Sequence, residues 1–147
     1  MRETSPALPL DTPADAGSAL AEAPFDVTPA MAPAAPVLFA SPHSGSHYPA
    51  SMQEALCVPL IDVRRTEDAF IDELFAGAPA LGASLVAARY GRSVVDLNRD
   101  PHELDAAMFH DGPPRPCALP TARVEAGLGC LPRVGARGEA LYGRLLS

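Results

Sequence analysis

A histidine lies where an apolar segment of the chain meets a polar loop. His43 follows the run Val37–Ala40 and lies in a loop with Pro42 and Gly45. Imidazole is the commonest metal ligand among side chains, and ligands of open α/β sheets bind beyond the carboxyl ends of strands. His43 is therefore a candidate metal ligand. The alternative is a loop histidine that only hydrogen-bonds the backbone.

A carboxylate 25 residues further on is the second candidate ligand. Asp68 lies in the first turn of a predicted helix, where the free amide groups stabilise a negative charge. That purely structural role is the alternative, because a ligand role also needs a neighbour that orients the carboxylate. The nearby Glu67, Asp72 and Glu73 are expected to be solvated helix charges.

Arg92, Asn98 and Arg99 stand at the two ends of one short apolar segment. The planar fork of arginine matches a carboxylate with two parallel hydrogen bonds, and asparagine adds a further donor. The three residues are therefore candidates for binding an acidic substrate. The alternative is that the arginines form ordinary ion pairs with neighbouring acids, which are Asp96, Asp100 and Glu103.

Apolar runs that end at polar loops predict the strands that would position these residues. They are 37–40, 85–88 and 94–97. Because the first run is apolar on both faces, it is expected to be a central strand with helices on both sides. The sequence therefore indicates an α/β fold.

Two helices are predicted between and after these strands. Phe70, Ile71, Leu74, Phe75 and Ala78 fall at helical spacing, with Thr66 as the N-cap. Residues 138–142 begin a second helix, and 124–134 predict a weak strand or a loop.

Residues 1–35 contain six prolines among alanines and scattered acids. Such a segment buries too little apolar area to offset the entropy of ordering it, so it is expected to be a disordered leader. The folded domain would then span 36–147. About three strands and one firm helix are too few for a complete α/β sandwich, so these residues are expected to be the N-terminal part of a larger domain.

Composition narrows the classes of partner. The net charge is −7 and none of the 11 cationic residues is lysine, which argues against nucleic acid. No apolar run approaches the roughly 20 residues that a membrane helix needs. Three cysteines without a CxxC spacing favour a reducing compartment, so a cytoplasmic location is expected. The oligomeric state is left open.

Three separated motifs together resemble the N-formylglutamate amidohydrolase family. They are Ser41-Pro42-His43-Ser44-Gly45 with Tyr48-Pro49, Arg65-Thr66-Glu67-Asp68-Ala69-Phe70, and Ala88–Arg99. The resemblance runs from about residue 37 to 145 and leaves the predicted leader uncovered. Each motif alone would be weak, but their order and spacing match as a set.

The resemblance implies a zinc-carboxypeptidase-like fold, which is a three-layer α/β/α sandwich with a mixed, mostly parallel sheet. It implies zinc-dependent hydrolysis of N-formyl-L-glutamate, or of another N-acyl acidic amino acid, to formate and glutamate in histidine catabolism. Carried over by motif, His43 and Asp68 would be zinc ligands. Asn98 and Arg99 would hold the substrate carboxylate, assisted by Arg92.

The chain departs from the family pattern in its later part. Family members carry a downstream Asp-x-His-Ser motif that supplies another metal ligand, and no such motif occurs here. No residue matches the late catalytic carboxylate either, so the catalytic residue is unassigned. Two alternatives to an active amidohydrolase therefore stay open. The chain could be a non-catalytic carboxylate-binding fragment, or it could be an inactive truncated homologue.

Overall fold

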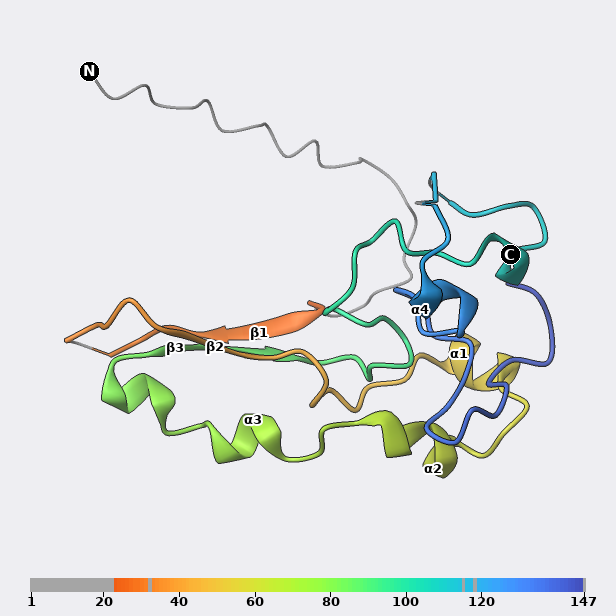
Figure 1. The fold of residues 1–147 in the computed structure, drawn as a ribbon. Helices are drawn as coiled ribbons and strands as arrows, with labels where there is room; N and C mark the ends of the chain where they lie inside the picture. Colours follow the sequence, from red (N-terminus) through yellow and green to blue (C-terminus); the bar gives the residue numbers. More distant parts are fainter. Residues whose placement is uncertain (1–22, 32, 115, 118, 147) are drawn as a thin grey trace, which may run out of the picture.

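The computed structural model describes residues 23–31, 33–114, 116–117 and 119–146, which form a small α/β fold. Its described part contains one mixed sheet of three strands in the order β1-β3-β2. The strands are β1 (Phe25–Thr28), β2 (Leu38–Ser41) and β3 (Ser84–Ala88). β2 runs parallel to β3, whereas β1 runs antiparallel to it. The sheet forms one end of the molecule (Figure 1).

Short helices make up most of the remaining regular structure. The α-helices are α1 (Ala50–Ala55), α2 (Leu60–Val63), α3 (Ile71–Leu74) and α4 (Ala122–Glu125). The 3₁₀ helices are Arg64–Thr66, Ala78–Leu81 and Ala106–Met108. In Figure 1, α3 runs along the sheet, while α1, α2 and α4 lie at the opposite end of the molecule.

The structure confirms two of the predicted strands. The run 37–40 corresponds to β2 and the run 85–88 to β3. The central position predicted for the first run is wrong within the described residues, because β3 lies between β1 and β2. Phe39 of β2 stacks on Phe75 with ring centroids 4.9 Å apart, so the segment that carries α3 covers one face of the sheet.

The third predicted strand, 94–97, is wrong. Val94 ends one turn, in which its amide donates to the Gly91 carbonyl at 2.8 Å, and Leu97 begins another. The Asp96 side chain accepts a hydrogen bond from the Asn98 amide at 3.0 Å, which bends the chain away from an extended path. Val94 packs instead against the apolar core, so tertiary packing outweighs the strand propensity of the two valines.

The continuous helix predicted from Thr66 to Ala78 is also wrong. The segment breaks into a 3₁₀ turn, α3 and a second 3₁₀ turn, and Phe70 has a left-handed φ of 66°. Thr66 does not cap a helix, because its hydroxyl donates to the Val63 carbonyl at 2.9 Å. The Asp68 amide donates to the His43 carbonyl at 2.9 Å, which removes it from any helical ladder.

Residues 138–142 form bridges instead of the predicted helix. Ala140 pairs with Val134 and Tyr142 with Leu56. Between them Leu141 is fully buried in a core that it shares with Tyr48 and Val63. Within 124–134, α4 takes up the first residues, and its N-cap Thr121 accepts from the Val124 amide.

Strand β1 lies inside the segment that was predicted to be a disordered leader, so that prediction is wrong for residues 25–28; residues 1–22 lie outside the described part. Phe25–Thr28 pair with four consecutive residues of β3. The Asp26 carboxylate accepts a hydrogen bond from Arg89 Nε at 2.7 Å, and this bond lowers the pKa of Asp26. Backbone pairing thus orders a stretch that buries little apolar area.

Removal of β1 is expected to destabilise the fold. A chain that lacks residues 1–35 should unfold at a lower temperature than one that lacks residues 1–22, with a loss of roughly 2 kcal/mol from the broken ladder. Thermal unfolding followed by circular dichroism measures the difference. Equal midpoints for the two truncations would show that β1 contributes nothing.

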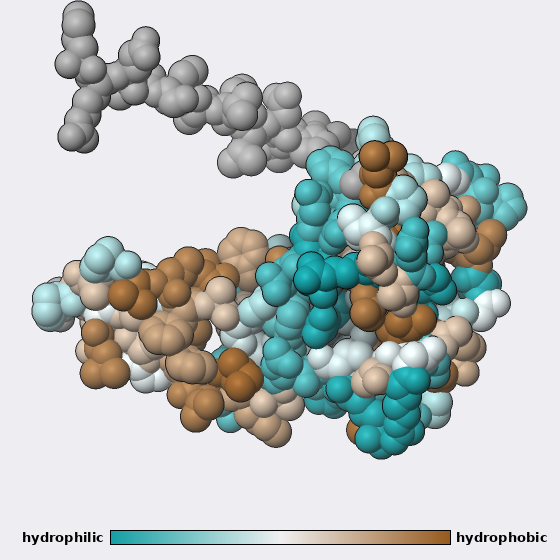
Figure 2. Space-filling view, in the orientation of Figure 1, coloured by the Kyte–Doolittle hydropathy of each residue, from teal (hydrophilic) through white to brown (hydrophobic). Residues whose placement is uncertain are grey.

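Apolar side chains gather on the surface of the lobe that carries the sheet and α3 (Figure 2). The large exposed ones in this lobe are Phe25, Val27, Met31, Val37, Leu38, Phe70, Leu74, Phe75 and Leu81. Among the described residues, no helix has the length and apolar character needed to cross a membrane.

Candidate active site

The loop after β2 is held against the end of β3 by the main chain. His47 forms a parallel bridge with Tyr90, and its amide donates to the Arg89 carbonyl at 2.9 Å. A Cβ at position 45 would overlap the carbonyl oxygen of Tyr90, so only glycine permits this close approach. This close approach fixes the conformation of the loop, and in that conformation His43 is buried.

His43 lies between two carboxylates that come from distant parts of the chain. Its Nε2 is 2.8 Å from Asp96 Oδ1, and its Nδ1 is 3.3 Å from Asp68 Oδ2. The histidine is buried, with 7% of its surface exposed. The structure thus brings together the two residues that the sequence proposed as metal ligands, and it adds a third residue, Asp96.

Asp68 is fixed by its main chain rather than by a helix. Its amide donates to the carbonyl oxygen of His43, so the two residues approach each other through both backbone and side chain. The Asp68 side chain is 56% exposed, whereas that of Asp96 is 2% exposed. One carboxylate therefore faces solvent and the other lies inside the protein.

Asp96 is the most heavily bonded acid of the cluster. It accepts hydrogen bonds from His43, from the Asn98 amide and from Arg92 Nε at 3.0 Å, and Arg99 Nε lies 3.8 Å away. Burial alone would raise the pKa of Asp96. The hydrogen bond from His43, the Asn98 amide and the charge of Arg92 outweigh burial and hold the pKa below its usual value.

Both ring nitrogens of His43 face a carboxylate. An ionised carboxylate only accepts hydrogen bonds, so Nε2 carries the hydrogen that it donates to Asp96. With a second hydrogen, Nδ1 donates to Asp68 in the same way, whereas without it Nδ1 has a lone pair that can bind a metal ion. This arrangement suits a metal ligand, because a carboxylate behind a ligating histidine fixes its tautomer and orientation.

The two arginines form ion pairs with a neighbouring acid, which was the alternative to a substrate-binding role. Arg92 and Arg99 both face Asp96 through Nε. Arg99 also donates to the carbonyl oxygens of Leu128 and Asn98. For Arg92 the terminal nitrogens have no partner among the described residues, so they are available to a ligand. The Asn98 side chain is exposed and does not line the adjoining pocket.

A pocket of about 560 Å³ adjoins the cluster and includes Asp68, Arg92 and Asp96 in its wall. Glu67 also lines it, and its side chain is only 5% exposed. Glu67 is therefore not the solvated charge that the sequence predicted. It accepts hydrogen bonds from the Tyr48 hydroxyl at 2.9 Å and from Arg64 Nε at 3.1 Å.

The spacing of His43 and Asp68 fits two ligands of one zinc ion. Ligands about 2.0–2.1 Å from a tetrahedral zinc lie about 3.3–3.4 Å apart, which matches the 3.3 Å between Nδ1 and Oδ2. Within the described residues, no group of three or more His, Cys, Asp and Glu side chains is arranged to hold a metal ion. The donors present therefore fit part of a zinc site.

Sequence reasoning considered Asp96 only as an ion-pair partner of the arginines, although the structure places it at the centre of the cluster. A signal was present, because Asp96 is the one acid within the apolar run 94–97. A carboxylate buried among apolar residues needs several donors to offset the loss of hydration. The arginines and histidine of the neighbouring motifs supply those donors.

Fold and site together define a class of protein: an α/β chain with a histidine–carboxylate cluster beyond the carboxyl end of a parallel strand. The family model of N-formylglutamate amidohydrolase matches residues 35–147. The chain therefore belongs to the N-formylglutamate amidohydrolase family, which confirms the family indicated by the sequence motifs.

A crystal structure of N-formylglutamate amidohydrolase from Ralstonia eutropha JMP134 is similar to this chain. The two are 32% identical and superpose with a TM-score of 0.75. The match covers 85% of this chain and 44% of the other, so the chain spans less than half the length of that relative. No curated protein matches the chain.

Proposed function

We propose that this chain contributes the His43–Asp68 half of a zinc-dependent amidohydrolase site that acts on an N-formyl or N-acyl acidic amino acid. The products would be the acid of the acyl group and the free amino acid, which are formate and glutamate when the substrate is N-formylglutamate. Family membership supports the reaction class. The observation that carries the proposal is the pair His43 Nδ1 and Asp68 Oδ2 at zinc-ligand spacing, with Asp96 bonded behind the histidine.

Each member of the cluster has a separate task in this proposal. His43 and Asp68 would hold zinc, while Asp96 keeps the hydrogen on Nε2 so that Nδ1 stays free to bind. A zinc ion bound there would lower the pKa of a water molecule and polarise the amide carbonyl of the substrate. The catalytic carboxylate that passes a proton to the leaving amine is not assigned to a residue of this chain.

Substrate carboxylates are proposed to bind at the arginine side of the pocket. Arg92 lines the pocket, whereas Asn98 and Arg99 lie outside its wall, with Arg99 Nε 3.8 Å from the same Asp96 carboxylate. A guanidinium that is already held through Nε loses little further freedom on binding, which favours affinity for a dicarboxylate substrate. Charge attraction by these arginines also offsets the net charge of −7.

The complete fold is proposed to be the three-layer α/β/α sandwich with a mostly parallel sheet. The parallel β2–β3 pair and the coverage of one sheet face by the α3 segment support it. The three cysteines of the sequence have no CxxC spacing, which favours a reducing compartment, such as the cytoplasm, as the place where the reaction occurs.

Calorimetry with N-formylglutamate tests the proposal. The protein should bind the ligand when zinc is supplied, and a chelator should abolish the binding. His43→Ala and Asp68→Asn should abolish it too, while Asp72→Asn, a change outside the pocket, should not. Zinc-dependent binding that survives both site substitutions would overturn the assignment. Release of formate, measured in the same samples, reports whether turnover accompanies binding.

A non-catalytic carboxylate-binding fragment is the second candidate. The presence of only two suitably placed donors within the described residues favours it, because a two-ligand site holds zinc weakly. In this case N-formylglutamate would bind equally well with and without the chelator, and no formate would be released. An inactive homologue would bind neither zinc nor ligand.

Arg92→Lys is expected to weaken binding of N-formylglutamate about tenfold. Lysine keeps the positive charge but loses the planar fork that pairs with both carboxylate oxygens. Arg99→Lys should have an effect in the same direction, and Arg123→Lys, at an exposed position of α4, serves as the control. Equal dissociation constants for the three variants would remove both arginines from the substrate site.

A further inference from the structure

A second, larger pocket lies behind the turn that borders the candidate active site. Its volume is about 710 Å³, which falls within the usual range of small-molecule sites. Two consecutive residues separate the pockets, because Ser93 lines the candidate active site and Val94 lines the second pocket. None of the residues proposed to bind zinc or substrate lines this second pocket.

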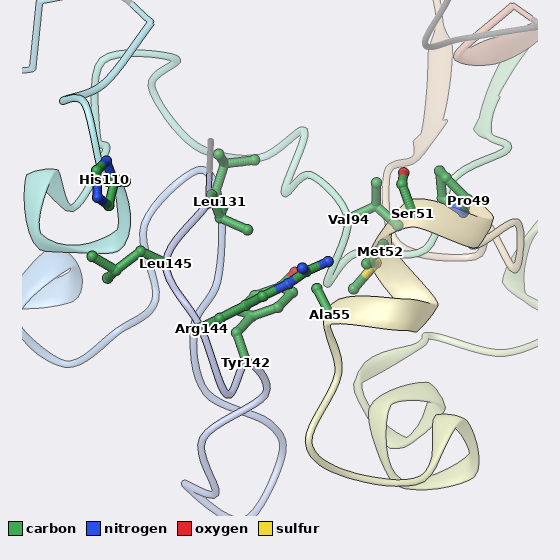
Figure 3. Close-up of a pocket in the computed structure, with 11 residues that line it drawn as sticks. Pro49, Ser51, Met52, Ala55, Val94, His110, Leu131, Tyr142, Arg144 and Leu145 are labelled. Carbon is green, nitrogen blue, oxygen red and sulfur yellow. The ribbon is translucent and has the colours of Figure 1, made fainter.

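The wall of the second pocket is largely apolar. Met52 and Ala55 of α1 form one side, and Leu131 and Leu145 form another (Figure 3). Tyr142 adds its ring, while its hydroxyl donates to the Ser93 carbonyl at 3.3 Å. Burial raises the pKa of Tyr142 to about 12, so the phenol is neutral. Moving the apolar part of a ligand from water into this pocket would therefore cost little free energy.

One cation lies against this apolar wall. Arg144 lines the pocket, and Figure 3 shows its guanidinium extending towards the side formed by Met52 and Val94. No aspartate or glutamate among the described residues lines the pocket, and none of them forms an ion pair with Arg144. His110 also lines it, but its Nδ1 already pairs with Asp111 at 2.9 Å. The guanidinium of Arg144 can therefore pair with an anionic ligand.

We propose that this pocket binds a small amphipathic carboxylate, with the carboxylate on Arg144 and the hydrocarbon body against Met52, Leu131 and Leu145. An ammonium head group would be repelled by the guanidinium. A neutral head group would form no ion pair with the exposed guanidinium of Arg144. The site is distinct from the proposed zinc site and does not depend on amide hydrolysis.

Nuclear magnetic resonance of methionine methyl groups tests this assignment, with octanoate as the probe below its micelle concentration. The Met52 methyl reports on the pocket, and the exposed Met31 methyl, on the sheet lobe, reports on general association. Octanoate is expected to shift the Met52 signal saturably and to leave Met31 unchanged. Octylammonium, which has the same tail, should shift Met52 little at the same concentration.

Arg144→Gln should weaken octanoate binding about tenfold, which is typical of the loss of one charge-assisted contact at a partly solvated site. Arg123→Gln removes an exposed arginine outside the pocket and should leave the dissociation constant unchanged. Equal affinity for octanoate and octylammonium would overturn the proposal. So would octanoate binding that Arg144→Gln does not weaken, or a shift that occurs equally at Met31.

Discussion

Asp96→Ala is expected to lower the free energy of unfolding by about 3–5 kcal/mol, because it breaks a buried charged network from its centre. The substitution leaves Arg92 without its ion-pair partner among the described residues and His43 Nε2 without an acceptor. It also frees the Asn98 amide, which bonds to the same carboxylate. Urea unfolding followed by circular dichroism measures the loss.

Asp100→Ala is the matched control for this prediction. Asp100 also accepts hydrogen bonds from a backbone amide and from a histidine ring, both of His102, but its side chain is 61% exposed. Water replaces those bonds, so the urea midpoint should change little. Equal midpoint shifts for the two alanine variants would mean that Asp96 is not the buried centre of the cluster.

Gly45→Ala is expected to destabilise the protein by about 3 kcal/mol, which lies at the upper end of the usual cost of overpacking. The added Cβ would overlap the backbone of Arg89 and Tyr90, which cannot rotate away as a side chain could. The loop would have to retreat from β3 and would carry His43 with it. A lower unfolding midpoint together with weaker zinc binding is the expected result.

Gly77→Ala is the control, because it makes the same chemical change without the overlap. A Cβ at position 77 meets no atom within 4 Å, and the residue has a right-handed φ of −78°. Alanine there should leave stability unchanged or raise it by about 0.4–1 kcal/mol through a less flexible unfolded chain. If Gly45→Ala behaved like Gly77→Ala, the close approach of loop and strand would be refuted.

The strands were predictable where apolar residues stop abruptly at a polar loop, as at Ala40 and Ala88. The pattern failed where long-range contacts decide the conformation. Val94 and Val95 have high strand propensity, yet the Asp96 side chain bends the backbone around itself. Leu141 lies in a segment with good helix formers, but its side chain fills the core beside Val63.

The helices were predicted least well because each is too short to be stabilised by its own sequence. An isolated helix of four to six residues is unstable in water, so packing decides where it begins and ends. The spacing of apolar residues around Phe70–Ala78 could not reveal that the Asp68 amide bonds to His43. Nor could it show that Phe70 adopts a left-handed conformation.

For the candidate site, motif order was more informative than local pattern. The residue types and positions of His43 and Asp68 predict two metal ligands, and the structure brings their side chains within 3.3 Å. The role of Asp96 depends on burial, which a single sequence reports only indirectly. The approach of both arginines to Asp96 depends on the turn that follows Gly91, where the sequence predicted a strand.

The main-chain bond between Asp68 and His43 has a mechanical consequence. Two stretches of polypeptide are fastened to each other at the very residues whose side chains face one another. When either stretch shifts, its counterpart is pulled along, and the gap between the two donor atoms is preserved. Their separation is thus governed by covalent geometry and one peptide hydrogen bond, and it should tolerate substitutions that loosen the surrounding surface.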